Sequence, residues 1–177
     1  TKRPFNFSAG PAILPQEVLA RAAEAVTALK LDGHSANSPD IGLSLLEISH
    51  RGAPYQAVHE GAIELAHRVL GIPEDTHQIL LLPGGASMQF VMVPANLSRP
   101  GTPASFVDTG AWSTKAIAEA RHFGEVRVLG SSADSKFDHI PTVDWADADG
   151  SSFLHITTNN TIYGTEYESL PDSPEGV

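Results

Sequence analysis

The turn with the clearest chemical potential lies between an apolar run at 78–82 and a helical pattern at 87–97. Its sequence, Pro-Gly-Gly-Ala-Ser, occupies residues 83–87. Two glycines let backbone N–H groups point into one space, and the following helix N-terminus adds partial positive charge, so Ala86 and Ser87 could bind a phosphate. The turn lacks the residues of a P-loop, of a dinucleotide-binding fingerprint and of a hydrolase nucleophile elbow. A tight strand-to-helix turn without a ligand remains the alternative interpretation.

Three further groups could contact a ligand. Trp112 follows the apolar run ASFVDT, where parallel sheets bind ligands, and an indole there can stack on a flat ring. His50 and Arg51 offer an imidazole and a guanidinium fork for carboxylate or phosphate groups. Asn159-Asn160-Thr161, after FLHITT, offers amides and a hydroxyl. A packed aromatic, a surface salt bridge and an Asx-type turn are the respective structural alternatives.

The composition excludes several kinds of site and partner. The chain has 177 residues, a formal net charge of -10 and no cysteine, which excludes disulfides, thiolate metal sites and cysteine nucleophiles. Its eight histidines lack metal-ligand spacing, so we expect no metal. Without a basic stripe or an apolar run of about 20 residues, nucleic acid and membrane are not expected partners. We expect a soluble, cytoplasmic protein.

Apolar residues at helical spacing predict helices that position these groups. The predicted helices cover 15–30, 58–69, 87–97 and 112–123. Gly71 and Pro73 are stop signals for the second helix, and Pro94 is expected to end or kink the third.

Apolar runs predict strands at about 78–82, 105–109, 125–129 and 153–157 in one sheet, with 43–48 as a further candidate. Because these strands alternate with helices from residue 78 onward, the pattern predicts an α/β fold with a mainly parallel sheet flanked by helices. Ligands bind such sheets at the carboxyl ends of the strands, so we expect Ser87, Trp112 and Thr161 to converge on one concave site.

Five motifs occur in an order that is typical of one enzyme family. They are FNFSAGPAILP, EISHRG, LLPGGASMQF, FVDTGAWSTKAIAEA and HITTNNTIYGTEY, and they extend from Phe5 to about Tyr167. In these motifs the chain resembles the phosphoserine aminotransferases, which are pyridoxal-phosphate enzymes of the class V aminotransferase group. The resemblance implies a type I aminotransferase-like fold, with an extended arm at 1–14 and part of the cofactor-binding large domain at 15–177.

The resemblance also implies a role for each candidate residue. Ala86 and Ser87 would begin the phosphate site of pyridoxal phosphate, Trp112 would stack on its pyridine ring, and Thr161 would hydrogen-bond near its phenolic oxygen. His50 and Arg51 would hold anionic groups of the substrate. Some members of the family have arginine in place of Ser87, so in this chain the charge of the phosphate must be neutralised by other groups.

The implied reaction transfers an amino group from glutamate to 3-phosphohydroxypyruvate in serine biosynthesis, in a homodimer. The four lysines are Lys2, Lys30, Lys115 and Lys136, and none matches the Schiff-base lysine motif of the family. The aspartate that binds the ring nitrogen has no match either. We therefore expect no catalytic residue in this chain, no activity from these residues alone, and a truncated domain that ends in a loop. The alternative is a non-catalytic α/β module that binds a phosphorylated small molecule or a protein partner.

Overall fold

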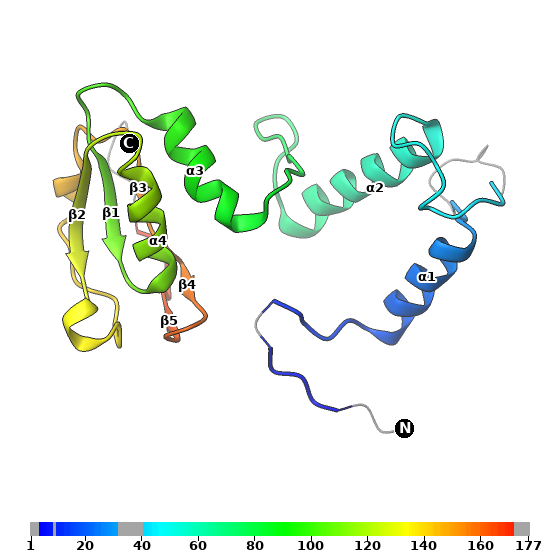
Figure 1. The fold of residues 1–177 in the computed structure, drawn as a ribbon, viewed down its shortest axis with the longest axis horizontal. Coiled ribbons are helices and arrows are strands. Elements are labelled where there is room, and N and C mark those ends of the chain that lie inside the picture. The colour runs from blue at the N-terminus through cyan, green and yellow to red at the C-terminus, as the bar shows by residue number, and fades with distance from the viewer. Residues whose placement is uncertain (1–3, 9, 32–40, 172–177) are drawn as a thin grey trace. The chain divides into compact units, whose positions relative to one another are not determined.

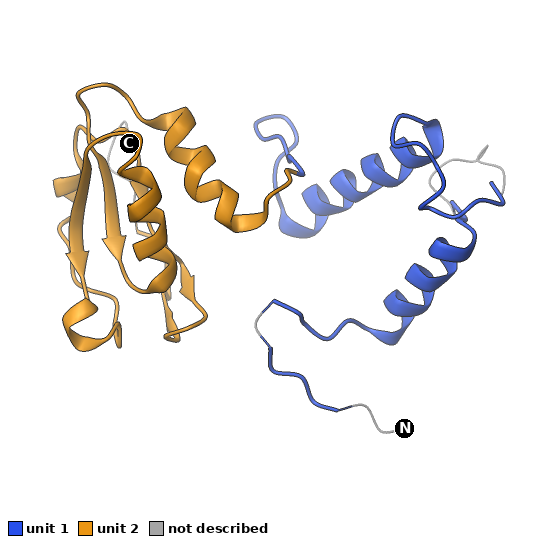
Figure 2. Ribbon diagram, in the orientation of Figure 1, with its two compact units in different colours: residues 1–81 blue, residues 82–177 orange. Residues whose placement is uncertain are grey.

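The computed structural model describes residues 4–8, 10–31 and 41–171, and the chain divides into two units, residues 1–81 and 82–177 (Figure 2). The first unit contains helices α1 (Gln16–Thr27) and α2 (Ala53–Leu70). Helix α2 begins after Gly52, has proline in its first turn, and ends at Gly71, whose φ of 65° is the left-handed conformation that glycine adopts without strain. The predicted stop at Gly71 is therefore confirmed.

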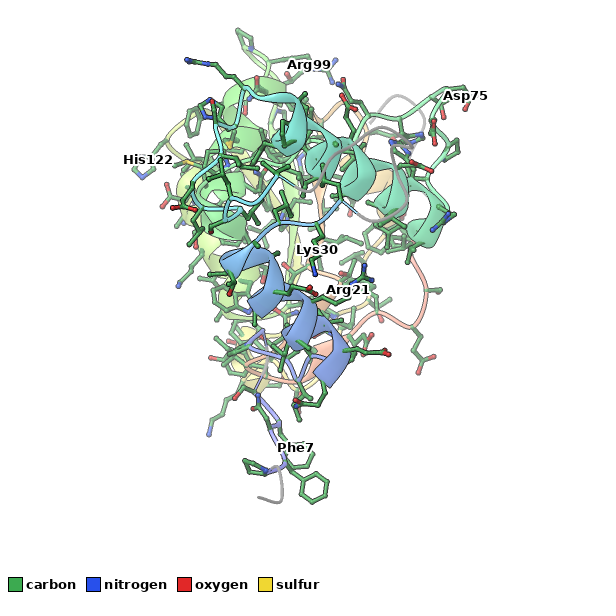
Figure 3. The ribbon with its side chains drawn as sticks, turned by 90° about the vertical axis from the view of Figure 1, so that its right-hand side faces the viewer. Phe7, Arg21, Lys30, Asp75, Arg99 and His122 are labelled. Atoms are coloured by element: carbon green, nitrogen blue, oxygen red, sulfur yellow. The ribbon has the colours of Figure 1, made fainter. Side chains whose placement is uncertain are left out.

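The first unit buries few of its side chains. Helix α1 has no buried residue, and in α2 only His67 is buried. Before α1, residues 4–8 and 10–14 form neither helix nor strand, and Phe7 is 93% exposed (Figure 3). The helices of this unit therefore have almost no buried core, although packing of an apolar face supplies most of the stability of helices in proteins.

Two strand predictions are wrong. Residues 43–48 form a turn, because the Ser44 hydroxyl accepts the Leu46 N–H at 3.0 Å and the Glu47 carboxylate accepts the Ser44 N–H at 2.9 Å. These local bonds satisfy the backbone in place of a strand ladder. Residues 78–82 form no strand either. Apolar side chains alone do not make a strand, which needs a neighbouring strand to pair its N–H and C=O groups.

The second unit is built on a parallel sheet (Figure 1). It contains β1 (Ala104–Asp108), β2 (Val126–Ser131) and β3 (Leu154–His155) in the order β2-β1-β3. Three of the four predicted strands are thus confirmed in one sheet. The register of β1 against β2 shifts by one residue after Phe106, so Val107 pairs with Gly130 and Leu129 is the extra residue of a β-bulge.

Two helices pack with this sheet. Helix α4 (Ala111–Ala120) packs against β1, and α3 (Gly85–Leu97) packs against α4. The core between them consists of Ala104, Phe106, Ala116, Ile117, Ala120 and Phe153, with Phe90, Val93 and Val126 packed at its border. The mainly parallel sheet with flanking helices is therefore confirmed.

Helix α3 continues through Pro94 to Leu97, the end that the sequence predicts, so this proline does not end the helix. Pro94 is buried, and its carbonyl accepts the Ser98 N–H at 3.0 Å. Only one intrahelical hydrogen bond is lost at a proline in the last turn, and burial of the ring offsets that loss.

The remaining elements are short. Two 3-10 helices, η1 (Ala133–Ser135) and η2 (Trp145–Ala148), follow β2, and an antiparallel hairpin of β4 (Asn159–Asn160) and β5 (Thr165–Glu166) follows β3. In the part of the chain that the structure describes, no helix has the length and apolar character that crossing a membrane requires.

Candidate functional site

A pocket of about 440 Å³ opens in the second unit where the parallel strands reach their carboxyl ends. Its walls come from the N-terminus of α3 at 84–87, from Phe90, from Trp112 on α4, and from 155–159 after β3. Segments that are far apart in the sequence therefore meet at the edge of the sheet where α/β folds bind ligands.

One wall of this pocket is the N-terminus of α3. Gly84 and Gly85 both have left-handed φ values, 93° and 61°, which reverse the chain just before the helix. A Cβ atom on Gly84 would collide with the Met88 side chain, so the turn requires glycine there. No side chain caps the helix, and the first backbone N–H groups of a helix lack intrahelical acceptors. Together with the helix dipole, these N–H groups near Ala86 and Ser87 suit an anion.

Trp112 supplies the flat wall of the pocket. Its indole Nε1–H donates to the Thr161 hydroxyl at 3.2 Å, and the Lys115 ammonium lies 4.9 Å from the centre of its ring. Lys115 is not among the residues that line the pocket. A cation over an indole is a favourable contact, and it accounts for Lys115 as a neighbour of Trp112.

The structure brings together four of the six predicted site residues. Ala86, Ser87 and Trp112 line the same pocket, and Thr161 joins them through its hydrogen bond to Trp112. The expected convergence of Ser87, Trp112 and Thr161 therefore agrees with the geometry of this unit.

His50 and Arg51 belong to the first unit, just before α2, and both side chains are exposed. The Arg51 N–H donates to the Ser49 hydroxyl at 3.2 Å, and the His50 carbonyl accepts from the Gln56 side chain at 2.7 Å. These bonds fix the backbone at the start of α2 and leave the imidazole and the guanidinium open to solvent.

His155 is a pocket residue that the sequence analysis did not single out. Its ring stacks on Phe106 with 5.0 Å between centroids, and its Nδ1 atom is buried without a hydrogen-bond partner among the described residues. Burial lowers the pKa of His155 below its usual value, which favours the neutral imidazole. A histidine in an otherwise apolar strand, next to its carboxyl end, was the available signal.

The three residues Asn159-Asn160-Thr161 separate into different roles. Asn159 lines the pocket, while Asn160 is fully buried and its Nδ2 donates to the Thr109 hydroxyl at 2.9 Å. Thr161 contacts Trp112. The interpretation of these residues as a set that reads one polar ligand is therefore wrong for Asn160, whose amide is used inside the protein.

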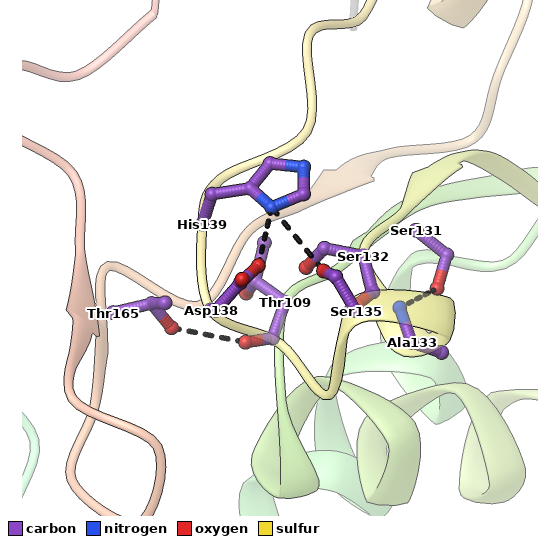
Figure 4. Close-up of polar contacts among 8 residues, drawn as sticks. All are labelled: Thr109, Ser131, Ser132, Ala133, Ser135, Asp138, His139 and Thr165. Atoms are coloured by element: carbon purple, nitrogen blue, oxygen red, sulfur yellow. Dashed lines mark hydrogen bonds and ion pairs between the residues drawn. The ribbon is translucent and has the colours of Figure 1, made fainter.

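A second polar group does not form a catalytic site. The Asp138 carboxylate and the Ser135 hydroxyl both contact Nδ1 of His139, at 2.6 and 3.3 Å (Figure 4). In a nucleophilic triad the serine and the acid bind opposite ring nitrogens, so His139 cannot relay a proton between them. In the described ranges, no three His, Asp or Glu side chains are placed to hold a metal ion.

The comparisons with known proteins identify what the chain is similar to. Residues 4–172 match the family described as Aminotransferase class-V. A phosphoserine aminotransferase of Syntrophobacter fumaroxidans is 49% identical over 97% of this chain and 45% of its own length.

Two solved structures share the fold. Phosphoserine aminotransferase from Bacillus circulans subsp. alkalophilus has a TM-score of 0.83 at 36% identity, over 99% of this chain and 46% of its own. The phosphoserine aminotransferase with bound PLP from Trichomonas vaginalis has a TM-score of 0.79 at 32% identity, over 97% of this chain and 49% of its own. The expected type I aminotransferase-like fold is confirmed, and the chain spans less than half the length of these relatives.

Proposed function

The chain belongs to the aminotransferase class-V family, and we propose that the protein containing it transfers an amino group from glutamate to 3-phosphohydroxypyruvate. The products are 2-oxoglutarate and phosphoserine, so the amino group and the keto oxygen exchange carriers. The name of the relatives supports this choice of substrates. The reaction would serve serine biosynthesis, with a further role in pyridoxine biosynthesis.

One observation carries the proposal, namely the juxtaposition of an indole wall and a helix N-terminus in one pocket. Pyridoxal phosphate has a flat aromatic ring and a phosphate on a short arm, and the two features of the pocket match these two parts. When bound, the cofactor supplies an aldehyde for the amino group and a ring that takes up electrons. The relative with bound PLP supports the same cofactor.

In this proposal each residue of the pocket has one task. The N–H groups at Ala86 and Ser87 hold the phosphate, and the dipole of α3 supplies positive charge where some relatives have an arginine. Trp112 stacks on the ring and excludes water from one of its faces. Thr161 donates or accepts near the ring oxygen. The neutral His155 imidazole borders the pocket without adding charge.

His50 and Arg51 are proposed to hold the anionic groups of the substrate, since a guanidinium binds phosphate or carboxylate with two parallel hydrogen bonds. We propose further that residues 1–14 are an arm, that 15–177 are part of the cofactor-binding domain, and that the protein is a cytoplasmic homodimer. The lysine that carries the cofactor and the acid at the ring nitrogen would come from residues outside this chain.

The test uses the complete native polypeptide that contains this chain, supplied with pyridoxal phosphate and glutamate. We expect release of 2-oxoglutarate with 3-phosphohydroxypyruvate, and much less with hydroxypyruvate, which lacks the phosphate. Binding of pyridoxal phosphate with no transfer to any keto acid would favour the alternative, a non-catalytic module. A Trp112→Ala variant should weaken cofactor binding by about 1 to 3 kcal/mol, the range measured for stacking on an aromatic side chain.

A further inference from the structure

Two buried hydrogen bonds to Thr109 connect the hairpin after β3 to the turn before α4. Asn160 Nδ2 donates to the Thr109 hydroxyl at 2.9 Å, and the Thr165 hydroxyl donates to the Thr109 carbonyl at 3.0 Å (Figure 4 shows the second bond). Thr109 and Asn160 are fully buried and Thr165 is 7% exposed. These bonds join both strands of the hairpin to the end of β1.

The turn that receives these bonds is itself fixed. The Thr109 and Gly110 N–H groups both donate to the Ser113 hydroxyl, at 2.8 and 2.9 Å, and the Ser113 hydroxyl lies 2.8 Å from the Asp108 carboxylate. A Cβ atom on Gly110 would collide with the Asn160 amide, so glycine permits the close approach of the hairpin. Trp112 follows directly after this turn, so the conformation of the turn also determines the position of the indole.

We propose that Asn160 and Thr165 are positioning residues that set the distance between Trp112 and Thr161. Successive side chains of an extended strand point to opposite sides. The buried Asn160 amide therefore fixes which side of the hairpin Asn159 presents to the pocket, and it anchors the residue just before Thr161. As a result, the Trp112 Nε1 atom lies 3.2 Å from the Thr161 hydroxyl, to which it donates a hydrogen bond. The consequence for cofactor binding rests on the proposed function.

One feature shows that this connection is made at a local cost. The Asn160 Oδ1 atom is buried without a hydrogen-bond partner among the described residues, and an unpaired buried oxygen is unfavourable. A connection that served stability alone would be made by apolar side chains, which leave no buried oxygen unpaired.

The experiment compares Thr109→Val, which removes the acceptor with little change of shape, with Thr109→Ser, which keeps it. The background carries Trp145→Phe in the complete native polypeptide, so that within this chain Trp112 is the only tryptophan. Tryptophans outside this chain are also replaced by phenylalanine. The first readout is acrylamide quenching of Trp112 without cofactor, and the second is the affinity for pyridoxal phosphate.

We expect Thr109→Val to raise the quenching constant about twofold and to weaken cofactor binding about tenfold, the effect of one lost buried hydrogen bond. Thr109→Ser should stay within about twofold of the parent in both readouts, as expected when the hydrogen bond is kept. Ser151→Ala is the matched control, because it removes a buried hydroxyl bond to Ser105 (2.7 Å) at the opposite end of β1. It should lower the melting temperature without changing Trp112. Thr165→Val replaces Thr109→Val if the latter does not fold.

Unchanged quenching in Thr109→Val or Thr165→Val would overturn the inference, and so would an equal change in Ser151→Ala. If quenching changes as expected but the parent binds no pyridoxal phosphate, the positioning role stands and the proposed function fails. If the parent binds cofactor and all variants bind it equally, the hairpin bonds are structural only and the inference fails.

Discussion

The two units of this chain bury their side chains very differently. In the second unit Phe106 and Val107 are 1% and 0% exposed, whereas in the first unit Val69 and Leu70 at the end of α2 are 75% and 68% exposed. Both units contain helices. In this chain, strands of the sheet form where a neighbouring strand pairs with them and a core covers them, whereas helices form even where few of their side chains are buried.

The largest effect is expected from emptying the buried core. Phe106→Ala in the 177-residue chain should lower the free energy of unfolding of the second unit by about 3 to 5 kcal/mol, because it removes a buried ring and leaves a cavity. Val69→Ala in α2 should change the free energy of unfolding of the first unit by less than about 0.5 kcal/mol. Urea unfolding of both variants measures the comparison, and similar costs would show that the exposed face of α2 is buried in solution.

A smaller effect is expected at two glycines that share a conformation. Gly84 and Gly71 have left-handed φ values of 93° and 65°, but a Cβ atom would meet Met88 at Gly84 and open space at Gly71. Gly71→Ala should cost about 1 kcal/mol from backbone strain alone, and Gly84→Ala more than that. Thermal unfolding measures both. Only Gly84→Ala should also weaken the binding of pyridoxal phosphate, and equal losses of affinity would contradict the assignment of the anion site.

A pH effect is expected from burial inside the second unit. The pKa of His155 is lowered by desolvation, so the unfolded chain binds its proton at higher pH than the folded chain does. Stability should therefore be constant above the unfolded pKa of about 6.5, and should fall as the pH drops from there through the lower folded pKa. In His155→Phe this part of the pH dependence should disappear, while the stack on Phe106 is kept. Unfolding curves of both proteins between pH 5 and 8 provide the test. The same dependence of stability on pH in His155→Phe and in the parent would contradict the prediction.

The smallest effect is expected from the lysines of the two units. Lys115 lies over Trp112, Lys30 is paired with Glu24 at 2.6 Å, and Lys2 lies outside the described residues. Among the described residues, no lysine lines the pocket at the N-terminus of α3, so none of them is held where it could react with the cofactor aldehyde. After incubation of the chain with pyridoxal phosphate and reduction with borohydride, peptide mapping should find only sparse labelling. One stoichiometric adduct on Lys115 would show that this chain holds an activated amine.

The sequence predicted what depends on local pattern and missed what depends on long-range pairing. Helices α1, α2, α3 and α4 were expected from apolar spacing, and β1 to β3 from apolar runs that alternate with them. Residues 78–82 are more continuously apolar than β1, yet they form no strand, because pairing is not encoded in the run itself.

The site shows the same division. Ser87 and Trp112 were predictable because each begins a helix after an apolar run, and such positions share one edge of a parallel sheet. The role of the buried Asn160 amide was not predictable. An amide that binds a ligand has the same sequence signature as one that binds Thr109, which lies 51 residues earlier in the chain. The desolvation of His155 depends on Phe106 packing against its ring, which no local pattern contains.

The bulge in β2 also has a consequence for chain length. Because Leu129 is the unpaired extra residue, a deletion at this position would leave every pair from Ala104–Val126 to Asp108–Ser131 intact. Deletion of Val128 or Gly130 instead would let Leu129 take the vacated pairing position, so Ser131 would still contact the Asp108 carboxylate, which lies 3.3 Å from its hydroxyl. The bulge thus lets this strand lose one residue without altering the edge of the sheet that carries the pocket.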